Sequence, residues 1–269
     1  MKHYKRVLTI AGSDSGGGAG IQADIKTISA CGCFATSAIT AITAQNTLGV
    51  TDIHAIPVST IKSQMAAVLG DIGTDSVKIG MLHNAETIRA VHETLQRFQI
   101  TNIVLDPVMV ATSGDRLLET EAVYALKEIL IPSARVITPN IPEAEILLGK
   151  KIDSQDDLPD YARALSLQGA VSVLLKAGHL KDNQLVDIFY NAETDEVIKL
   201  RSGRIESPNT HGTGCTLSSA FASFLARGFT LNNAAWKAKQ YTNGAIMAGA
   251  KYSIGKGHGP VNHFFQHWK

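Results

Sequence analysis

The strongest constraint on the fold is a repeated alternation between short apolar runs and longer segments with helical periodicity. Residues 7–11 form the first apolar run, a glycine-rich turn covers residues 12–20, and residues 21–30 are periodic. Short apolar runs bounded by turns indicate buried strands, and 3.6-residue periodicity indicates helices. Strands that alternate with helices predict an α/β fold in which a mostly parallel central sheet is flanked by helices on both faces.

The same alternation continues to the end of the chain. The expected strands are residues 7–11, 34–44, 50–58, 76–79, 102–105, 135–138 and 171–176, followed by a polar hairpin over 185–200. The expected helices are residues 21–30, 61–70, 85–98, 120–130, 142–148, 156–167, 215–227 and 231–250, with Ser59 and Thr60 capping the second. No linker, repeat or low-complexity tract interrupts this pattern, so we expect one domain over residues 1–269.

Composition excludes several classes of partner. A formal net charge of +1 leaves no basic field for nucleic acid. The apolar run after the basic N-terminal residues is too short for a signal peptide or a membrane span. Cys31 and Cys33 are too close for an easy disulfide, and the chain has only 3 cysteines. We therefore expect reduced thiols, a cytoplasmic location and no membrane partner.

Residues 209–216 read N-T-H-G-T-G-C-T and lead directly into an apolar, helical segment. Gly212, Thr213 and Gly214 allow backbone N–H groups to approach a ligand closely, and a helix N-terminus adds unpaired donors and partial positive charge. A cysteine in this position, Cys215, is expected to have a lowered pKa. The segment predicts a site for phosphoryl transfer. The alternative is a glycine loop before an ordinary helix, with Cys215 a small buried residue.

In a parallel sheet, ligands bind beyond the carboxyl ends of the strands. The polar or flexible side chains that follow the expected strands are those of Asp14, Gln45, Met81, Asp106, Asn140 and Lys176. Asp106 and Glu143 could hold Mg²⁺, and Lys176 could contact ATP phosphates. Structural interpretations also exist: Asn140 as a helix cap, Glu143 as a partner of the helix dipole and Lys176 as a solvated strand end.

Two common nucleotide-binding motifs are missing from the sequence. No glycine begins the G-x-x-x-x-G-K-[ST] pattern of a Walker A loop. Residues 16–20 lack the G-x-G-x-x-G spacing of dinucleotide-binding folds, and no strand end offers the acidic residue that should follow. These absences disfavour a dinucleotide oxidoreductase.

The combined motifs resemble the hydroxymethylpyrimidine/phosphomethylpyrimidine kinase family of thiamine biosynthesis, within the ribokinase-like superfamily. The matching segments are residues 11–24, 45–47, 78–81, 106–109, 138–140 with Glu143, 210–216 and 257–260, and they span nearly the whole chain. The resemblance implies a ribokinase-like fold and ATP-dependent phosphorylation of 4-amino-5-hydroxymethyl-2-methylpyrimidine to its monophosphate and then its diphosphate. It also implies Mg²⁺ as cofactor and a homodimer. Ala177 stands where the family usually has glycine, and we expect little consequence from its methyl group.

The resemblance also implies roles for individual residues. It places the pyrimidine against Gly12, Asp24, Gln45, Met81 and Val108, and the transferred phosphoryl group in an anion hole formed by Gly212, Thr213, Gly214 and Cys215. It assigns the nucleotide to Asn140, Lys176 and Lys239, and magnesium to Asp106 and Glu143. A glutamine amide complements an aminopyrimidine, which offers a donor amine beside an acceptor ring nitrogen. The Cys215 thiol would act as base where related sugar kinases carry an aspartate.

Some of these assignments have open alternatives. Gln45 could be a satisfied strand-end amide, and either Lys237 or Lys239 could simply face solvent. His211 is expected to order over the site, whereas His258 has no assigned role.

Two rival functions remain. A pyridoxal kinase of the same superfamily can share the H-G-T-G-C segment, but such relatives typically lack the sequence Gln45-Asn46-Thr47. A non-catalytic pyrimidine sensor on this fold would be expected to have lost the magnesium or anion-hole residues. Asp106, Glu143, Lys176 and Cys215 are all present, which favours an enzyme.

Overall fold

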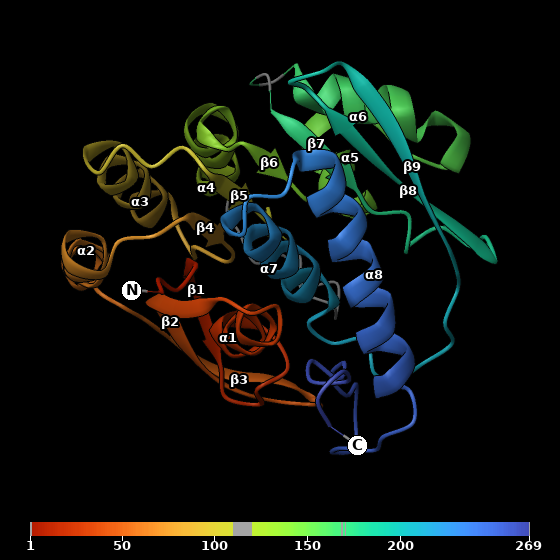
Figure 1. The fold of residues 1–269 in the computed structure, drawn as a ribbon, viewed down its shortest axis with the longest axis horizontal. Coiled ribbons are helices and arrows are strands. Elements are labelled where there is room, and N and C mark those ends of the chain that lie inside the picture. The colour runs from red at the N-terminus through yellow and green to blue at the C-terminus, as the bar shows by residue number, and fades with distance from the viewer. Residues whose placement is uncertain (1, 110–119, 168, 170, 269) are drawn as a thin grey trace.

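The computed structural model describes residues 2–109, 120–167, 169 and 171–268 (Figure 1). Its strands form one sheet of order β3-β2-β1-β4-β5-β6-β7-β8-β9. The strands are β1 (Arg6–Asp14), β2 (Phe34–Asn46), β3 (Gly49–Ala55), β4 (Ser76–Ile79), β5 (Ile103–Leu105), β6 (Val136–Ile137), β7 (Ser172–Leu175), β8 (Gln184–Asn191) and β9 (Glu196–Gly203). The strands from β2 to β7 in this order are parallel, whereas β3, β8 and β9 pair antiparallel at the two edges. The expected mostly parallel sheet is confirmed.

Helices cover both faces of the sheet (Figure 1). They are α1 (Gly20–Ala30), α2 (Val58–Ala67), α3 (Ala85–Arg97), α4 (Thr120–Ala125), α5 (Ile141–Leu148), α6 (Leu158–Ser166), α7 (Thr213–Ala226) and α8 (Leu231–Gly249). One apolar cluster joins the sheet to α2, α3, α4, α5 and α6, and a second joins it to α1, α7 and α8. Successive strand residues alternate between them: Leu8 lies in the first cluster and Val7 in the second, as the two-residue period of a strand requires. None of the described helices combines the length and apolarity needed to cross a membrane.

The starts of α2 and α7 differ from expectation. Ser59 and Thr60 do not cap α2, because the helix begins earlier, at Val58, behind Pro57, whose ring fixes a suitable φ. Helix α7 begins two residues before Cys215. Its N-cap is Gly212, which has φ 78°, a left-handed conformation that favours glycine.

Helix α7 runs through the centre of the second layer. Every residue from Thr216 to Ala226 is buried, so no face of this segment is exposed to solvent, and its polar members are hydroxyl residues: Thr216, Ser218, Ser219 and Ser223. Its N-terminal loop pairs with the chain after α8 through a bridge between His211 and Pro260. The chain after α8 also donates the His258 backbone N–H to the Thr47 carbonyl oxygen, beyond the end of β2. Three distant segments therefore meet beside the carboxyl ends of the central strands.

Candidate active site

Asp106, Lys176 and Gly214 come together where β5, β7 and α7 end or begin. The Lys176 ammonium lies 3.2 Å from Asp106 Oδ1, and the Thr138 hydroxyl donates to the same carboxylate over 2.9 Å. A methyl group built on Gly214 would lie 3.3 Å from Asp106 Oδ2 and 3.5 Å from Lys176 Nζ. The backbone at the start of α7 therefore packs closely against this ion pair, and an added methyl group would be in tight contact with Asp106. Burial favours the neutral amine, but Asp106 and Glu143 raise the pKa of Lys176.

Asn140 and Glu143 form a complete capping box at the start of α5. The Asn140 side chain accepts from the Glu143 backbone N–H, and the Glu143 carboxylate accepts from the Asn140 backbone N–H, each over 2.9 Å. The proposed structural role of Asn140 as a cap is thus confirmed. Burial, opposed by Lys176 and reinforced by Asp106, raises the pKa of Glu143 to about 7. Two carboxylates that repel each other in this way offer a suitable position for a cation.

The expected lowering of the Cys215 pKa is wrong. Part of the residue surface is exposed, but dense packing around the sulfur is the largest effect and raises the pKa of the thiol to about 11. Lys78 and the Gly20 backbone N–H favour the thiolate, whereas the Asp24 and Asp106 carboxylates disfavour it. The prediction of a lowered pKa considered the helix N-terminus but neither the packing around the sulfur nor these two buried carboxylates.

The opening glycine-rich turn and the α7 loop are in direct contact. His211 Nε2 lies 2.9 Å from Asp14 Oδ2 and 3.4 Å from Gln45 Nε2. A side chain on Gly212 would overlap the Gly18 carbonyl group, and one on Gly18 would overlap the His211 ring. These two turns interlock at glycines, so the loop that leads to Cys215 is held against Gln45. The expectation that His211 lies over the site is consistent with this position.

The remaining residues expected at the pyrimidine differ in accessibility. Gly12 contacts Met81 closely, since an added methyl group would lie 2.6 Å from Met81 Cε. Met81 and Val108 are both partly exposed. Asp24 is fully buried, and its carboxylate accepts from the Lys78 ammonium over 2.9 Å and from the Ser219 hydroxyl over 2.8 Å. In this structure Asp24 is the counter-ion of an interior lysine.

Lys239 lies apart from the other nucleotide candidates. It is buried on α8, and its ammonium lies 2.7 Å from Asp187 Oδ2 on β8. The other oxygen of Asp187 accepts from the Ala177 backbone N–H over 2.8 Å, directly after Lys176. Lys239 is therefore linked through Asp187 to the backbone that directly follows Lys176. Lys237 instead lies 4.9 Å from the centre of the Phe229 ring.

Sequence reasoning gave no role to Lys78 or Asp187. Each is a charged residue inside an otherwise apolar strand, and each is buried with a partner of opposite charge. A charge in the middle of a short apolar run was the available signal, because such residues are seldom buried unless paired.

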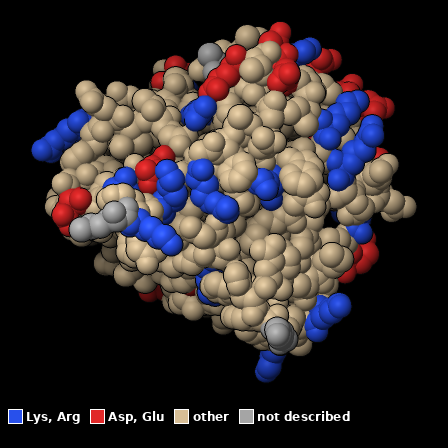
Figure 2. Space-filling model, in the orientation of Figure 1, with Lys and Arg blue, Asp and Glu red and all other residues tan. Residues whose placement is uncertain are grey.

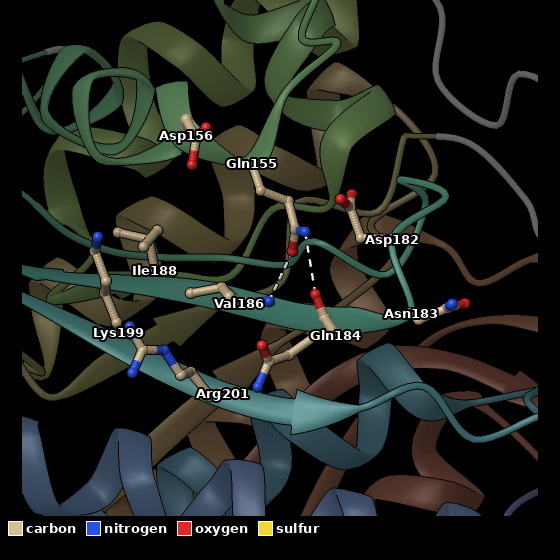
Figure 3. A pocket seen from close by; sticks show the side chains of 9 residues that line it. All are labelled: Gln155, Asp156, Asp182, Asn183, Gln184, Val186, Ile188, Lys199 and Arg201. Carbon is tan, nitrogen blue, oxygen red and sulfur yellow. Dashed lines mark hydrogen bonds between the residues drawn. The ribbon is translucent and has the colours of Figure 1, made fainter.

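The visible face carries interspersed acidic and basic side chains, with basic ones gathered over the β8–β9 hairpin (Figure 2). A hollow of about 400 Å³ lies on the α6 side of this hairpin, and its walls include Val186, Lys199 and Arg201 (Figure 3). Gln155 spans one side of it, where its amide donates to the Gln184 carbonyl oxygen and accepts from the Val186 N–H. None of the residues expected at the active site lines this hollow.

A family model described as phosphomethylpyrimidine kinase matches residues 14–262. The chain belongs to the phosphomethylpyrimidine kinase family. It is 50% identical over 263 residues to the hydroxymethylpyrimidine/phosphomethylpyrimidine kinase of Rhizobium meliloti, covering 97% of this chain and 98% of that relative. The crystal structure of phosphomethylpyrimidine kinase from Clostridium difficile 630 is similar, with a TM-score of 0.80 and 44% identity, covering 90% of this chain and 99% of that one.

Pyridoxal kinases share the fold. The Staphylococcus aureus pyridoxal kinase in complex with AMP-PCP and pyridoxal has a TM-score of 0.88 and 32% identity, covering 99% of this chain and 96% of that one. The expected ribokinase-like fold is confirmed, and so is the assignment to the hydroxymethylpyrimidine and phosphomethylpyrimidine kinases of thiamine biosynthesis. The chain is a phosphotransferase of this pathway.

Proposed function

We propose that the two interlocked turns bind the acceptor pyrimidine and the migrating phosphoryl group of ATP side by side. The observation that carries this proposal is the contact of His211 with both Asp14 and Gln45, four residues before Cys215. Gln45 offers an amide to the aminopyrimidine edge of 4-amino-5-hydroxymethyl-2-methylpyrimidine. Met81 and Val108 supply apolar surface to the two faces of the ring, and the absence of a side chain at Gly12 accommodates the Met81 methyl group.

Backbone N–H groups of Gly212, Thr213, Gly214 and Cys215 serve as the anion hole. They lie at the first turn of α7, where N–H groups lack acceptors within the helix, and donors of this kind stabilise charge that develops on a transferred group. The Thr213 N–H donates to the Thr210 carbonyl oxygen over 3.2 Å and would have to exchange that bond for the ligand. Lys176 provides a nearby cation, and its ion pair with Asp106 keeps the ammonium at the α7 N-terminus. Asn140 and Lys239 have structural roles in this scheme. Asn140 caps helix α5, and Lys239 is the counter-ion of Asp187.

The residues at the carboxyl edge fit a magnesium ion. Mg²⁺ is usually held by one or two carboxylates together with substrate phosphates and water, and Asp106 and Glu143 supply two. Among the described residues, no group of 3 or more His, Cys, Asp or Glu side chains that could hold a metal ion gathers. Bound magnesium would neutralise phosphate charge at this position. Burial is the main cause of the raised pKa of Glu143, and Asp106 adds to it; a cation between the two carboxylates would offset the contribution of Asp106.

Cys215 contributes modestly to the first phosphorylation. With a thiol pKa of about 11 the thiolate is a small minority at neutral pH. Phosphoryl transfer passes through a loose transition state that needs little activation of the acceptor, so a weak base suffices. In the second phosphorylation the acceptor is a phosphate monoester. Its second pKa is about 6, so the attacking oxygen carries no proton to remove.

The direct test is to supply Mg-ATP with hydroxymethylpyrimidine, its monophosphate or pyridoxal, and to follow product masses. Two successive phosphate additions to the pyrimidine support the proposal. Exclusive phosphorylation of pyridoxal would instead support the alternative, a pyridoxal kinase, which the similarity to the S. aureus enzyme makes the second candidate. Omitting Mg²⁺ should abolish product formation with either acceptor.

Two organisational proposals accompany the chemistry. We propose that residues 1–269 form one domain, which the continuous sheet through all the described strands supports. We also propose a homodimer. Strand β3 is exposed along its whole length, with Val50 45% and Ile53 43% exposed, and natural sheets usually protect such an edge. Analytical ultracentrifugation at micromolar concentration tests the dimer, and a monomer there would contradict it.

A further inference from the structure

We infer that His211, held by Asp14, sets the orientation of the Gln45 side-chain amide. Through Gln45 it thereby selects which of two orientations, related by turning the ring over, the bound pyrimidine adopts. The inference rests on the proposed function, because it concerns the ring that Gln45 would bind. It makes His211 a positioning residue, which acts through Gln45 and does not itself touch the reacting atoms.

The first step concerns the proton on His211. The Asp14 carboxylate accepts backbone N–H groups from Gly16 over 2.8 Å, from Gly18 over 3.0 Å and from Ala19 over 2.8 Å. Burial disfavours its charge, but the hydrogen bonds from His211 and from the backbone keep the pKa of Asp14 below its usual value. An ionised carboxylate only accepts hydrogen bonds. The His211 Nε2 atom, 2.9 Å from Asp14 Oδ2, must therefore carry a proton.

The second step concerns Gln45. Its Nε2 lies 3.4 Å from His211 Nε2, and its Oε1 lies 3.2 Å from the Thr43 hydroxyl oxygen. Two donors would then face each other at His211. The single hydroxyl proton of Thr43 is also already used, because it is donated to the Ser13 carbonyl oxygen over 2.8 Å. Exchanging the amide nitrogen and oxygen removes both conflicts and leaves the side-chain shape almost unchanged. The Nε2 proton of His211 is then shared, over 2.9 Å with Asp14 and over the longer 3.4 Å with the Gln45 amide oxygen, as a three-centre hydrogen bond.

The exchanged amide has a defined polarity. Its oxygen accepts the longer branch of the His211 Nε2–H bond that Asp14 also accepts, and its nitrogen donates to the Thr43 hydroxyl oxygen. Each atom keeps one free site, a lone pair on the oxygen and one N–H on the nitrogen. The free lone pair can accept from the 4-amino group of the substrate, and the free N–H can donate to the neighbouring ring nitrogen.

This polarity determines where the reacting group of the substrate lies. In the pyrimidine, the carbon that bears the amino group is next to the carbon that bears the hydroxymethyl group. An amine on the His211 side therefore brings the hydroxymethyl oxygen to the side of the loop that continues to Cys215. A reversed amide would turn the ring over and bring that oxygen to the Thr43 side, away from the anion hole.

The test compares binding of two ligands to His211→Phe by titration calorimetry. One is 4-amino-5-hydroxymethyl-2-methylpyrimidine, and the other is the same molecule without its amino group. We expect the wild-type preference for the aminated ligand to fall about tenfold in His211→Phe, which corresponds to about 1.4 kcal/mol. His258→Phe is the matched control, because His258 is exposed on the adjoining loop and has no role in the site. Its preference should equal that of the wild type.

An equal loss for both ligands in His211→Phe would overturn the inference, since it would indicate general loosening of the loop. In a Gln45→Ala background, His211→Phe should cause no further loss of the preference for the aminated ligand. If His211→Phe lowers that preference as much in Gln45→Ala as in the wild type, the inference is also overturned. If the wild-type protein fails to bind the aminated pyrimidine at all, the proposed function fails, which is a separate result.

A measurement on the wild-type protein removes any dependence on variant folding. Long-range ¹⁵N–¹H correlation spectra report which ring nitrogen of a histidine carries a proton. We expect a proton on His211 Nε2 in the ligand-free protein at neutral pH. An unprotonated Nε2 would overturn the inference, because His211 could then accept from Gln45 in the unexchanged orientation.

Discussion

Gly212 and Gly228 stand just before and just after α7 and offer a matched pair of substitutions. Both have left-handed backbones, with φ of 78° and 86°, where a side chain costs about 1–2 kcal/mol. Only Gly212 is crowded: a methyl group there would lie 2.8 Å from the Gly18 carbonyl carbon and would overlap its oxygen. At Gly228 nothing lies within 4 Å of the added atom. The difference between the two variants therefore isolates the contact between the turns.

We expect Gly228→Ala to lose about 1 kcal/mol of the free energy of unfolding and to keep its activity. Gly212→Ala adds a steric cost of about 1–3 kcal/mol, because two backbones must move apart. A displacement of about 1 Å at the anion hole lowers kcat about a hundredfold. Urea unfolding monitored by tryptophan fluorescence measures stability, and a coupled ADP-release assay measures kcat. Equal stability losses in the two variants, with full activity in Gly212→Ala, would refute the claim that this contact shapes the site.

Three further predictions concern buried ionisable groups. Cys215→Ala should slow phosphorylation of the alcohol about tenfold or more and that of the monophosphate less than about twofold; equal losses would exclude the base role. The folded-state pKa of Glu143, about 7, exceeds its ordinary value of 4.5. Between pH 4.5 and 7, without magnesium, the folded protein therefore binds more protons than the unfolded chain, and its free energy of unfolding falls as the pH rises. This decrease in stability with pH should be smaller in Glu143→Gln, and smaller in the wild type when Mg²⁺ is added. Melting temperatures measured across this pH range test both expectations. Lys78→Met should lower the free energy of unfolding by about 3–5 kcal/mol, because it leaves the buried Asp24 carboxylate without its counter-ion. The double variant Lys78→Met/Asp24→Leu should recover part of that loss, as measured by urea unfolding.

The fold was predictable because its signals are local. Strand β4 coincides with the expected residues 76–79, and helix α3 differs from expectation by one residue at its end. The cap of α2 was not predictable from Ser59 and Thr60 alone, because Pro57 competes for the start of the helix. Residue ranges follow from periodicity, whereas a terminal residue depends on which of several neighbours supplies the cap.

The site was predictable as a set of residues and less so as a set of roles. The resemblance placed the pyrimidine at Gln45 and the transferred phosphoryl group at Cys215, which requires the end of β2 and the start of α7 to lie close together, and the contact between His211 and Gln45 is consistent with this. The raised pKa of Cys215 could not be derived, because it depends first on the burial of the sulfur in the folded protein and then on Lys78, Asp24 and Asp106, which are far away in the sequence. The pairing of Lys239 with Asp187 and of Asp24 with Lys78 could not be predicted for the same reason. The spacing of residues in the sequence does not indicate which distant charges pair in the fold.

The contact between Asp14 and His211 joins residues separated by 197 positions in the chain. His211 must therefore leave the ribosome before this pair can form, however early β1 and β2 pair in the nascent chain. Catalytic turnover in a translation reaction should accordingly begin only once the segment that contains His211 and α7 has been released and has folded.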